Sequence, residues 1–134
     1  MGLFQIEIPS ILDNILVVES FIDNAKDQLN ITDEIYGNIV ISLTESVNNA
    51  IVHGNLEDKN KMVTISLDVE EGNLKFMVSD EGIGFDPDAL PDPTSPDNIE
   101  NETGRGIFLM KHLCDEVNFI PPGNKVELVF YFND

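Results

Sequence analysis

The sequence predicts an α+β fold, a two-layer sandwich in which helices cover one face of a mixed sheet. Short segments in which apolar and polar residues alternate indicate strands, and longer segments with apolar residues three and four positions apart indicate amphipathic helices. These segments follow the order strand, helix, helix, strand, strand, long connection, helix, strand, strand. The chain has 134 residues, of which 42% are hydrophobic, so a single domain spanning residues 1–134 is expected.

The first half of the chain should form one strand and two helices. The strand contains Phe4, Ile6 and Ile8 in alternation with polar residues and stops at Pro9. Ser10 can cap the first helix, whose apolar stripe consists of Ile11, Ile15, Val18, Ile22, Ala25 and Leu29. A second helix should begin at Thr32 and end near His53-Gly54-Asn55, with a stripe made of Ile35, Ile39, Leu43, Val47 and Ala50.

The second half should form two hairpins, separated by a long connection and a helix. The first hairpin turns at Glu71-Gly72-Asn73, between inward-facing residues at 63, 65, 67 and 69 and at 74, 76 and 78. The segment from Asp80 to Thr103 has no regular pattern and contains prolines at 87, 91, 93 and 96, so it is expected to be either a functional lid or a disordered connection. A helix from about Gly106 to Asp115, with Cys114 as a buried small hydrophobe, should precede strands at 117–120 and 126–132.

The charge of the chain excludes two classes of partner. There are 25 acidic and 7 basic side chains, which give a net charge of −18. A surface of that sign repels phosphate backbones and anionic membranes, so neither direct nucleic-acid binding nor membrane docking is expected. The sequence also lacks a secretory signal and a long apolar run, which favours a cytoplasmic location.

Glu45 and Asn49 lie four residues apart in the second predicted helix and therefore share one of its faces. That face points roughly 140° away from the apolar stripe, at 100° per residue. A solvated helix face would explain an isolated pair of this kind. However, two adjacent asparagines in mid-helix, Asn48 and Asn49, lower helix propensity without an evident structural return. The pair is therefore a candidate for function.

Two glycine-rich segments complete the set of candidate residues. Asp80, Gly82 and Gly84 follow a predicted interior strand, where a carboxylate can accept a hydrogen bond from an amino group and glycines let a ligand approach the backbone. A simple strand-to-loop turn is the alternative. Gly104, Arg105 and Gly106 open a predicted helix, where free N–H groups and a guanidinium suit a phosphate. A glycine-rich helix cap is the alternative there.

The order and spacing of these three elements resemble the N, G1 and G2 boxes of the GHKL ATPase superfamily, which has the Bergerat ATP-binding fold. Within that superfamily, the segment Ser42 to Gly54 is most similar to the helix box of the small anti-sigma factor serine kinases. The resemblance covers nearly the whole chain. It is specific for ATP binding and less specific for the branch of the superfamily.

The resemblance implies a role for each candidate residue. Glu45 would be the general base and Asn49 the Mg²⁺ ligand. Asp80 would bind the adenine amino group, and residues 86–103 would be the ATP lid. The glycines would line the nucleotide: Gly82 and Gly84 at the base and ribose, and Gly104 and Gly106, with Arg105, at the phosphates.

The function predicted from this resemblance is a serine/threonine protein kinase of the anti-sigma factor type. It would phosphorylate a small STAS-type antagonist protein in a partner switch, and a sigma factor is a further expected partner. The alternative is a nucleotide-gated protein-binding module without turnover; the residual one is an acidic α+β domain with coincidental boxes. Family members often dimerise, and the sheet edge with the first helix is the natural surface for a homodimer. A calcium loop among Asp86, Asp88, Asp92 and Asp97 fits no EF-hand spacing.

Overall fold

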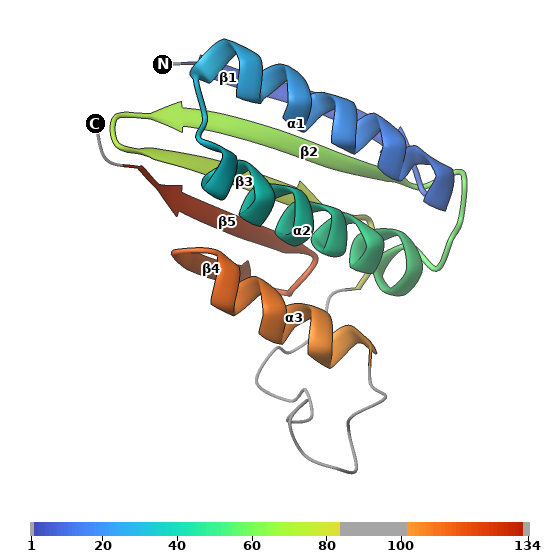
Figure 1. Cartoon of the computed structure of the whole chain (residues 1–134). Helices are drawn as coiled ribbons and strands as arrows, with labels where there is room; N and C mark the ends of the chain where they lie inside the picture. The colour runs from blue at the N-terminus through green and yellow to red at the C-terminus, as the bar shows by residue number, and fades with distance from the viewer. Residues whose placement is uncertain (1, 84–101, 133–134) are drawn as a thin grey trace.

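The computed structural model describes residues 2–83 and 102–132, which form a sheet with three helices packed on one face (Figure 1). The α+β sandwich predicted from the sequence is confirmed. The strands are β1 (Gly2–Pro9), β2 (Met62–Glu70), β3 (Asn73–Ser79), β4 (Glu116–Ile120) and β5 (Lys125–Tyr131). The helices are α1 (Ile15–Leu29), α2 (Asp33–Asn49) and α3 (Glu102–Leu113), with a 3-10 helix η1 (Leu12–Asn14) and a π-helical segment η2 (Ala50–Gly54).

The described sheet has the order β1-β2-β3-β5-β4, and each of its four neighbouring pairs is antiparallel. The prediction of a mixed sheet was therefore wrong. A single helix between two strands returns the chain to the starting end and gives parallel neighbours. Here two helices, α1 and α2, lie between β1 and β2, so β2 starts at the end where β1 stops and runs back beside it (Figure 1).

The core lies between the inner face of the sheet and the helices. Alternate residues of the central strands point inward, so that β3 shows a strict alternation of buried and half-buried side chains. The predicted helical stripes face them, except that Ile11 is 43% exposed and lies outside the core. The largest fully buried side chains include Ile22, Ile39, Leu43, Ile65, Leu67, Phe76, Met110 and Leu128. Cys114 is buried beside them, as predicted.

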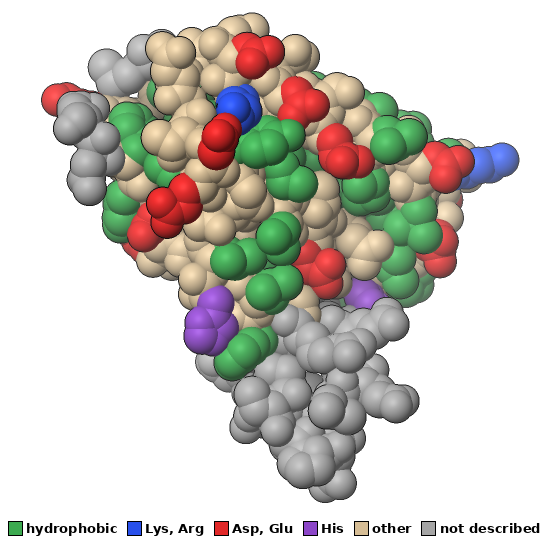
Figure 2. Space-filling view, viewed as in Figure 1, with side chains coloured by type: hydrophobic (Ala, Val, Ile, Leu, Met, Phe, Trp, Pro, Cys, Tyr) green, Lys and Arg blue, Asp and Glu red, His purple; other side chains and the backbone are tan. Residues whose placement is uncertain are grey.

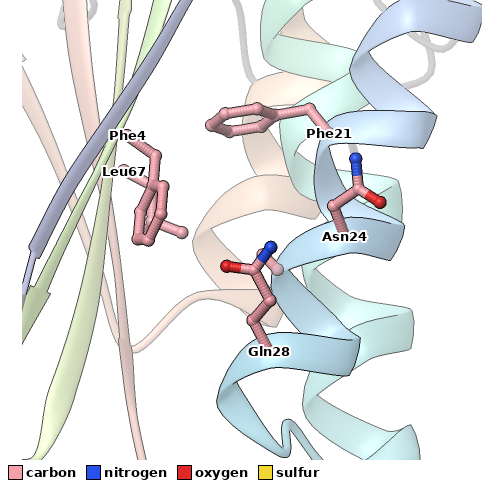
Figure 3. Close-up of a pocket in the computed structure, with 6 residues that line it drawn as sticks. Phe4, Phe21, Asn24, Gln28 and Leu67 are labelled. Atoms are coloured by element: carbon pink, nitrogen blue, oxygen red, sulfur yellow. The ribbon is translucent and has the colours of Figure 1, made fainter.

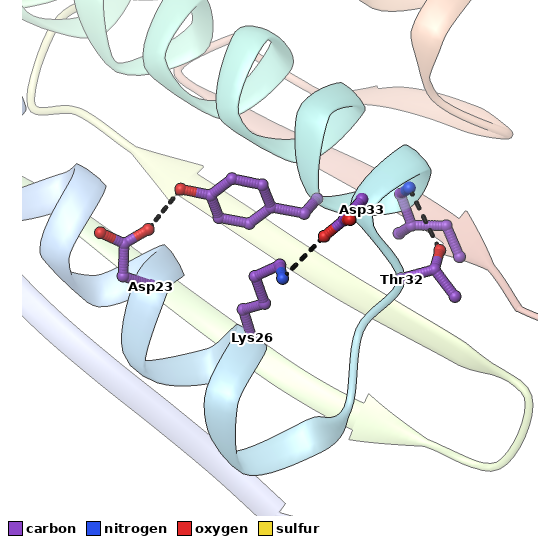
Figure 4. Close-up of polar contacts among 6 residues, drawn as sticks. Asp23, Lys26, Thr32 and Asp33 are labelled. Carbon is purple, nitrogen blue, oxygen red and sulfur yellow. Dashed lines mark hydrogen bonds and ion pairs between the residues drawn. The ribbon is translucent and has the colours of Figure 1, made fainter.

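The connection between α1 and α2 is held by polar contacts on the surface (Figure 4). Thr32 caps α2, as predicted, because its hydroxyl accepts a hydrogen bond from the Ile35 N–H at 3.4 Å. The Lys26 ammonium pairs with Asp33 at 2.9 Å and lies 5.3 Å from the centre of the Tyr36 ring. The Tyr36 hydroxyl in turn donates a hydrogen bond to Asp23.

Ser10 does not cap a helix, in contrast to the prediction. The helical segment begins with η1, and α1 starts only at Ile15, after Asn14, whose side chain makes no capping hydrogen bond. The Ser10 hydroxyl is fully buried and donates to the Lys61 carbonyl at 2.6 Å. The residue therefore joins the end of β1 to the chain that enters β2, which is a tertiary role that local sequence does not reveal.

Of the two helices that carry candidate residues, the first ends at Gly54, as predicted, and the second starts earlier than predicted. Helix α2 continues without a break into η2, where the Asn55 N–H donates to the Ala50 carbonyl at 2.8 Å. Helix α3 begins at Glu102, so Gly104, Arg105 and Gly106 lie within its first turns and do not precede it. Most of the predicted lid, and the aspartates of the alternative calcium loop, lie outside the described residues.

The face of the molecule covered by the helices carries many acidic side chains, in keeping with the composition (Figure 2). It also carries exposed apolar side chains on α2 and α3, namely Ile41, Phe108 and Leu109. No helix among the described residues is long and apolar enough to cross a membrane. His53 and His112 lie in the last turns of η2 and α3.

Candidate functional site

Asp80 lies directly after β3, which is an interior strand of the sheet, as predicted. Its N–H donates to the Asn124 carbonyl at 2.9 Å, and its Oδ1 accepts from the Gly82 N–H at 2.7 Å. The Asn124 side-chain amide also donates to the Asp80 and Gly82 carbonyls, at 3.4 and 3.5 Å. The turn formed by Asp80, Glu81 and Gly82, called here the Asp80 turn, is therefore tied to the end of the final hairpin.

The end of η2 packs directly on the Asp80 turn. A Cβ added to Gly54 would lie 2.8 Å from Asp80 Oδ1, and closer still to the other carboxyl atoms. A Cβ added to Gly82 would lie 2.8 Å from the Gly54 carbonyl carbon and 3.0 Å from Asp80 Oδ1. Real Cβ atoms essentially never lie under 3.0 Å from such atoms. Positions 54 and 82 must therefore be glycine for the end of η2 to pack this closely on the Asp80 turn.

The Asp80 carboxyl is half-buried in this contact, which changes its acidity. Burial raises the pKa of Asp80, and the hydrogen bond from the Gly82 N–H opposes part of that rise. The group combines partial burial with one carboxylate oxygen already bound to the backbone. A carboxyl in such surroundings can accept one further hydrogen bond from a ligand amino group.

Glu45 lies on α2 where this helix faces α3. A Cβ added to Gly106 would lie 2.8 Å from Cγ and Cδ of Glu45 and closer still to Oε1. Gly106 is buried, and its lack of a side chain lets the Glu45 carboxylate approach the N-terminal half of α3. The dipole of a helix favours negative charge near its N-terminus. The structure therefore brings the predicted acid of the helix box together with a glycine of the third box.

The remaining candidate residues are placed less completely. Asn49 is half-buried at the last position of α2, between Glu45 and Gly54 on the same continuous helix. Gly104 and Arg105 belong to the first turn of α3, where the backbone alone is described. Gly84 lies outside the described residues. No group of three or more His, Cys, Asp or Glu side chains able to hold a metal occurs in the described part of the chain.

Two residues of this region had no functional role in the sequence interpretation. Gly54 and Asn55 were expected only to stop a helix, because glycine and asparagine commonly do so. In the structure Gly54 contacts Asp80, and Asn55 is fully buried with its side chain bonded to the Asp80 turn. The signal that could have found them is the His-Gly-Asn segment at the end of the helix box, where Gly54 is the last residue of the box and Asn55 follows it.

The glycine contacts allow a test of whether the site fits a nucleotide. The two clusters lie on one helix, Gly54 with Asp80 at its end and Glu45 with Gly106 nine residues earlier. At the rise of an α-helix this separation is about 13 Å. At both clusters a Cβ would displace a carboxylate, so each cluster presents backbone and acid and no bulky side chain. These features fit an extended ligand that lies along the helix with an amino group beside Asp80.

A separate pocket lies between α1 and strands β1 and β2 (Figure 3). It has a volume of about 170 Å³ and is lined by Phe4, Phe21, Asn24, Ala25, Gln28 and Leu67. The ring of Phe4 on β1 faces α1, which contributes Phe21 and the two amide side chains (Figure 3). The pocket contains none of the candidate residues.

Comparison with known proteins gives similar sequences over most of the chain. It is 29% identical over 119 residues to the serine-protein kinase RsbW of Bacillus subtilis, covering 84% of this chain and 74% of that protein. It is 34% identical over 112 residues to the anti-sigma F factor of Bacillus thuringiensis, covering 80% of this chain and 77% of that protein. For the anti-sigma F factor of Shouchella clausii the values are 34% over 96 residues, 69% and 65%.

Comparison with solved structures supports the same fold. The structure of the RsbU and RsbW domains of a Mycobacterium tuberculosis protein matches with a TM-score of 0.66 at 13% identity. That match covers 98% of this chain and 32% of the other chain. The model of the histidine kinase-like ATPase domain matches residues 8–130. The chain therefore belongs to the histidine kinase-like ATPase domain family.

Proposed function

We propose that this protein is an ATP-dependent serine/threonine protein kinase of the anti-sigma factor type, with residues 1–134 acting as one catalytic domain. Its substrate would be the serine or threonine hydroxyl of a small STAS-type antagonist protein, and a sigma factor would be a second, competing partner. The names of the similar proteins from Bacillus subtilis and Bacillus thuringiensis, a serine-protein kinase and an anti-sigma F factor, support the kinase activity and the sigma-factor partner. An enzyme of this kind works where ATP is supplied, so we expect it in the cytoplasm.

The observation that carries the proposal is the close approach of Glu45 to Gly106. The first turn of α3, directly before Gly106, is where free N–H groups can bind phosphate. A carboxylate beside that turn would lie near a terminal phosphoryl group bound there. From there Glu45 can accept the proton of a substrate hydroxyl as that oxygen attacks, which is the role of a general base.

The other residues would bind and orient the nucleotide. Asp80 would accept a hydrogen bond from the adenine amino group, with the backbone at Gly82 and Gly84 beside the base and ribose. Gly104, Arg105 and Gly106 would hold the phosphates, and residues 86–103 would close over them. Mg²⁺, bound by the Asn49 side-chain oxygen and by phosphate oxygens, would offset part of the triphosphate charge in this acidic protein.

The test of the proposal is the Glu45→Gln variant. This change removes the proton acceptor but keeps the size of the side chain that faces Gly106. We expect phosphoryl transfer to a STAS-type substrate to be lost, while affinity for Mg-ATP stays within about twofold of the wild type. The control is Glu34→Gln, because Glu34 is an exposed residue in the first turn of the same helix. Phosphoserine is measured by mass spectrometry.

The alternative function is a nucleotide-gated binding module, and the anti-sigma F factors among the similar proteins favour keeping it. Such a module would bind its partner differently with ATP and with ADP but would transfer no phosphate. A pull-down with each nucleotide, read by mass spectrometry, separates the two functions. Partners retained by one nucleotide, without phosphoserine on any of them, would favour the module.

A homodimer is the further partner that we propose, formed through β1 and α1. Strand β1 is an edge of the sheet, so its outer backbone groups are available for pairing. Leu3 and Leu16 are 67% and 69% exposed there, and the pocket containing Phe4 and Phe21 lies between β1 and α1. We expect Leu16→Glu to produce a monomer in light scattering. A wild-type protein of monomeric mass at 100 μM would contradict this proposal.

A further inference from the structure

Asn55 lies fully buried at a point where four segments of the chain meet. Its side-chain Nδ2 donates to the Ser10 hydroxyl at 2.8 Å and to the Met62 carbonyl at 3.0 Å. Its Oδ1 accepts from the Glu81 N–H at 2.7 Å. One side chain therefore connects the end of β1, the start of β2 and the Asp80 turn to the residue that follows η2.

These contacts explain why an asparagine stands at this position. Both N–H bonds of the amide are used as donors, and the carbonyl oxygen is used as an acceptor. An aspartate offers no donor to the Met62 carbonyl, and an aliphatic side chain would leave the Glu81 N–H without this acceptor. A buried polar group that loses its partner costs more than a typical hydrogen bond contributes.

The Asp80 turn is held against η2 largely through this side chain. The Glu81 N–H belongs to the peptide unit that joins Asp80 to Glu81, so this hydrogen bond fixes the peptide unit directly after Asp80. Glu81 adds a second tie, because its Oε2 accepts from the Met62 N–H at 2.5 Å. The contact of Gly54 with the Asp80 carboxyl requires that turn and helix keep a constant separation.

We propose that Asn55 is a positioning residue for nucleotide selection. It sets the Asp80 carboxylate at a fixed place relative to α2–η2, the helix that also carries Glu45 and Asn49. The same rigid helix thereby positions Asp80 at the base end of the nucleotide and Glu45 and Asn49 at its phosphate end. This inference rests on the proposed function, since it assigns to Asp80 the recognition of an adenine amino group.

The test compares affinities for Mg-ATP and Mg-GTP. Guanine has a carbonyl oxygen where adenine has the amino group, so a correctly placed Asp80 carboxylate favours ATP. In Asn55→Ala the Glu81 N–H loses its acceptor, and the ratio of ATP to GTP affinity should fall about fivefold or more. Asn55→Asp keeps an acceptor for Glu81 and should retain most of the ratio at reduced stability.

Ser10→Ala is the matched control. It removes the hydrogen bond from Asn55 Nδ2 to the Ser10 hydroxyl and leaves Oδ1 of Asn55 bonded to the Glu81 N–H. We expect it to lower the denaturation midpoint while the ATP to GTP ratio stays at the wild-type value. A purely structural role for Asn55 predicts instead that both variants change the ratio equally, and that result would overturn the inference.

Two further results decide the remaining cases. A folded Asn55→Ala variant with the wild-type ratio overturns the inference but leaves the proposed function intact. A wild type that binds neither nucleotide overturns both. If Asn55→Ala does not fold, amide hydrogen exchange of the wild type decides, because the Glu81 N–H should exchange slowly without nucleotide. Rapid exchange at Glu81 would show that Asn55 does not hold the turn.

Discussion

Replacement of Gly54 by alanine tests the contact between η2 and the Asp80 turn directly. The added methyl group would lie 2.8 Å from Asp80 Oδ1 and closer to the rest of the carboxyl. Ordinary van der Waals contact begins at 3.4 Å, so Oδ1 must move by at least 0.6 Å and the other carboxyl atoms must move farther. The Gly82 N–H holds it from the other side at 2.7 Å, so the movement disturbs the whole turn.

The expected loss of affinity follows from the hydrogen bond that Asp80 would make. A hydrogen bond to a charged group contributes about 1.5–3 kcal/mol, which corresponds to about 10- to 100-fold in the dissociation constant. Overpacking costs about 1–3 kcal/mol of folding stability, and the better helix propensity of alanine returns up to about 1 kcal/mol. The variant should therefore fold with a stability loss of about 3 kcal/mol or less and bind Mg-ATP weakly.

Isothermal titration with Mg-ATP and urea denaturation measure the two effects separately. The control is Gly37→Ala, because a Cβ at Gly37 would meet nothing within 4 Å and the residue lies inside α2. That variant should gain about 0.5–1 kcal/mol of stability and bind like the wild type. A folded Gly54→Ala protein with wild-type affinity for Mg-ATP would refute the assignment of Asp80 to the nucleotide site.

Three further predictions concern other charged or reactive groups. Burial raises the pKa of Asp80, so ionisation of this carboxyl lowers the stability of the protein as pH rises through the pKa of the folded state. Asp80→Asn should therefore have a higher urea midpoint than the wild type at pH 7 but not in acid. The same variant should bind ATP more weakly. The hydrogen bond and charge of Lys26 lower the pKa of Asp33, so Lys26→Met should reduce stability at pH 7 but not at a pH well below the ordinary value of 3.8, as a denaturation series in pH would show. Burial raises the pKa of Cys114 to about 11, so a thiol reagent at pH 8 should modify the native protein slowly and the urea-unfolded protein quickly.

The fold could be predicted well from the sequence because the hydrophobic periods are regular. The strand alternation of β2 and β3 and the stripes of α1 and α2 each follow one period over their whole length. The strand directions were harder, since they depend on how many helices lie between two strands and on how those helices pack. Ser10 shows the limit of local signals: a serine before an apolar stripe suits a helix cap, yet its hydroxyl bonds to Lys61, 51 residues away.

The candidate site was predicted in part. The sequence pointed to Asp80 and Gly82 because glycines after a carboxylate at a strand end suggest a ligand near the backbone. It pointed to Gly106 because glycines and free N–H groups at the start of a helix suit a phosphate. It did not predict that Gly54 and Gly82 contact each other, because no local pattern reports a meeting of residues 28 positions apart. The start of α3 was misplaced for a similar reason. The low helix propensity of glycine suggested that α3 begins only at Gly106. In the structure Gly106 lies inside the helix and packs closely on Glu45.

The three glycines also change how the site should be understood in the free protein. At Gly54, Gly82 and Gly106 the place of a Cβ is already taken by another protein atom. The glycines therefore allow close contacts within the free protein, before any ligand binds. Those contacts position the carboxylates of Glu45 and Asp80. Because both carboxylates pack along one continuous helix, a change that shifts α2–η2 should alter nucleotide affinity and transfer rate together. A change confined to the Asp80 turn should alter affinity and base preference and leave the Glu45 contact with α3 as it is.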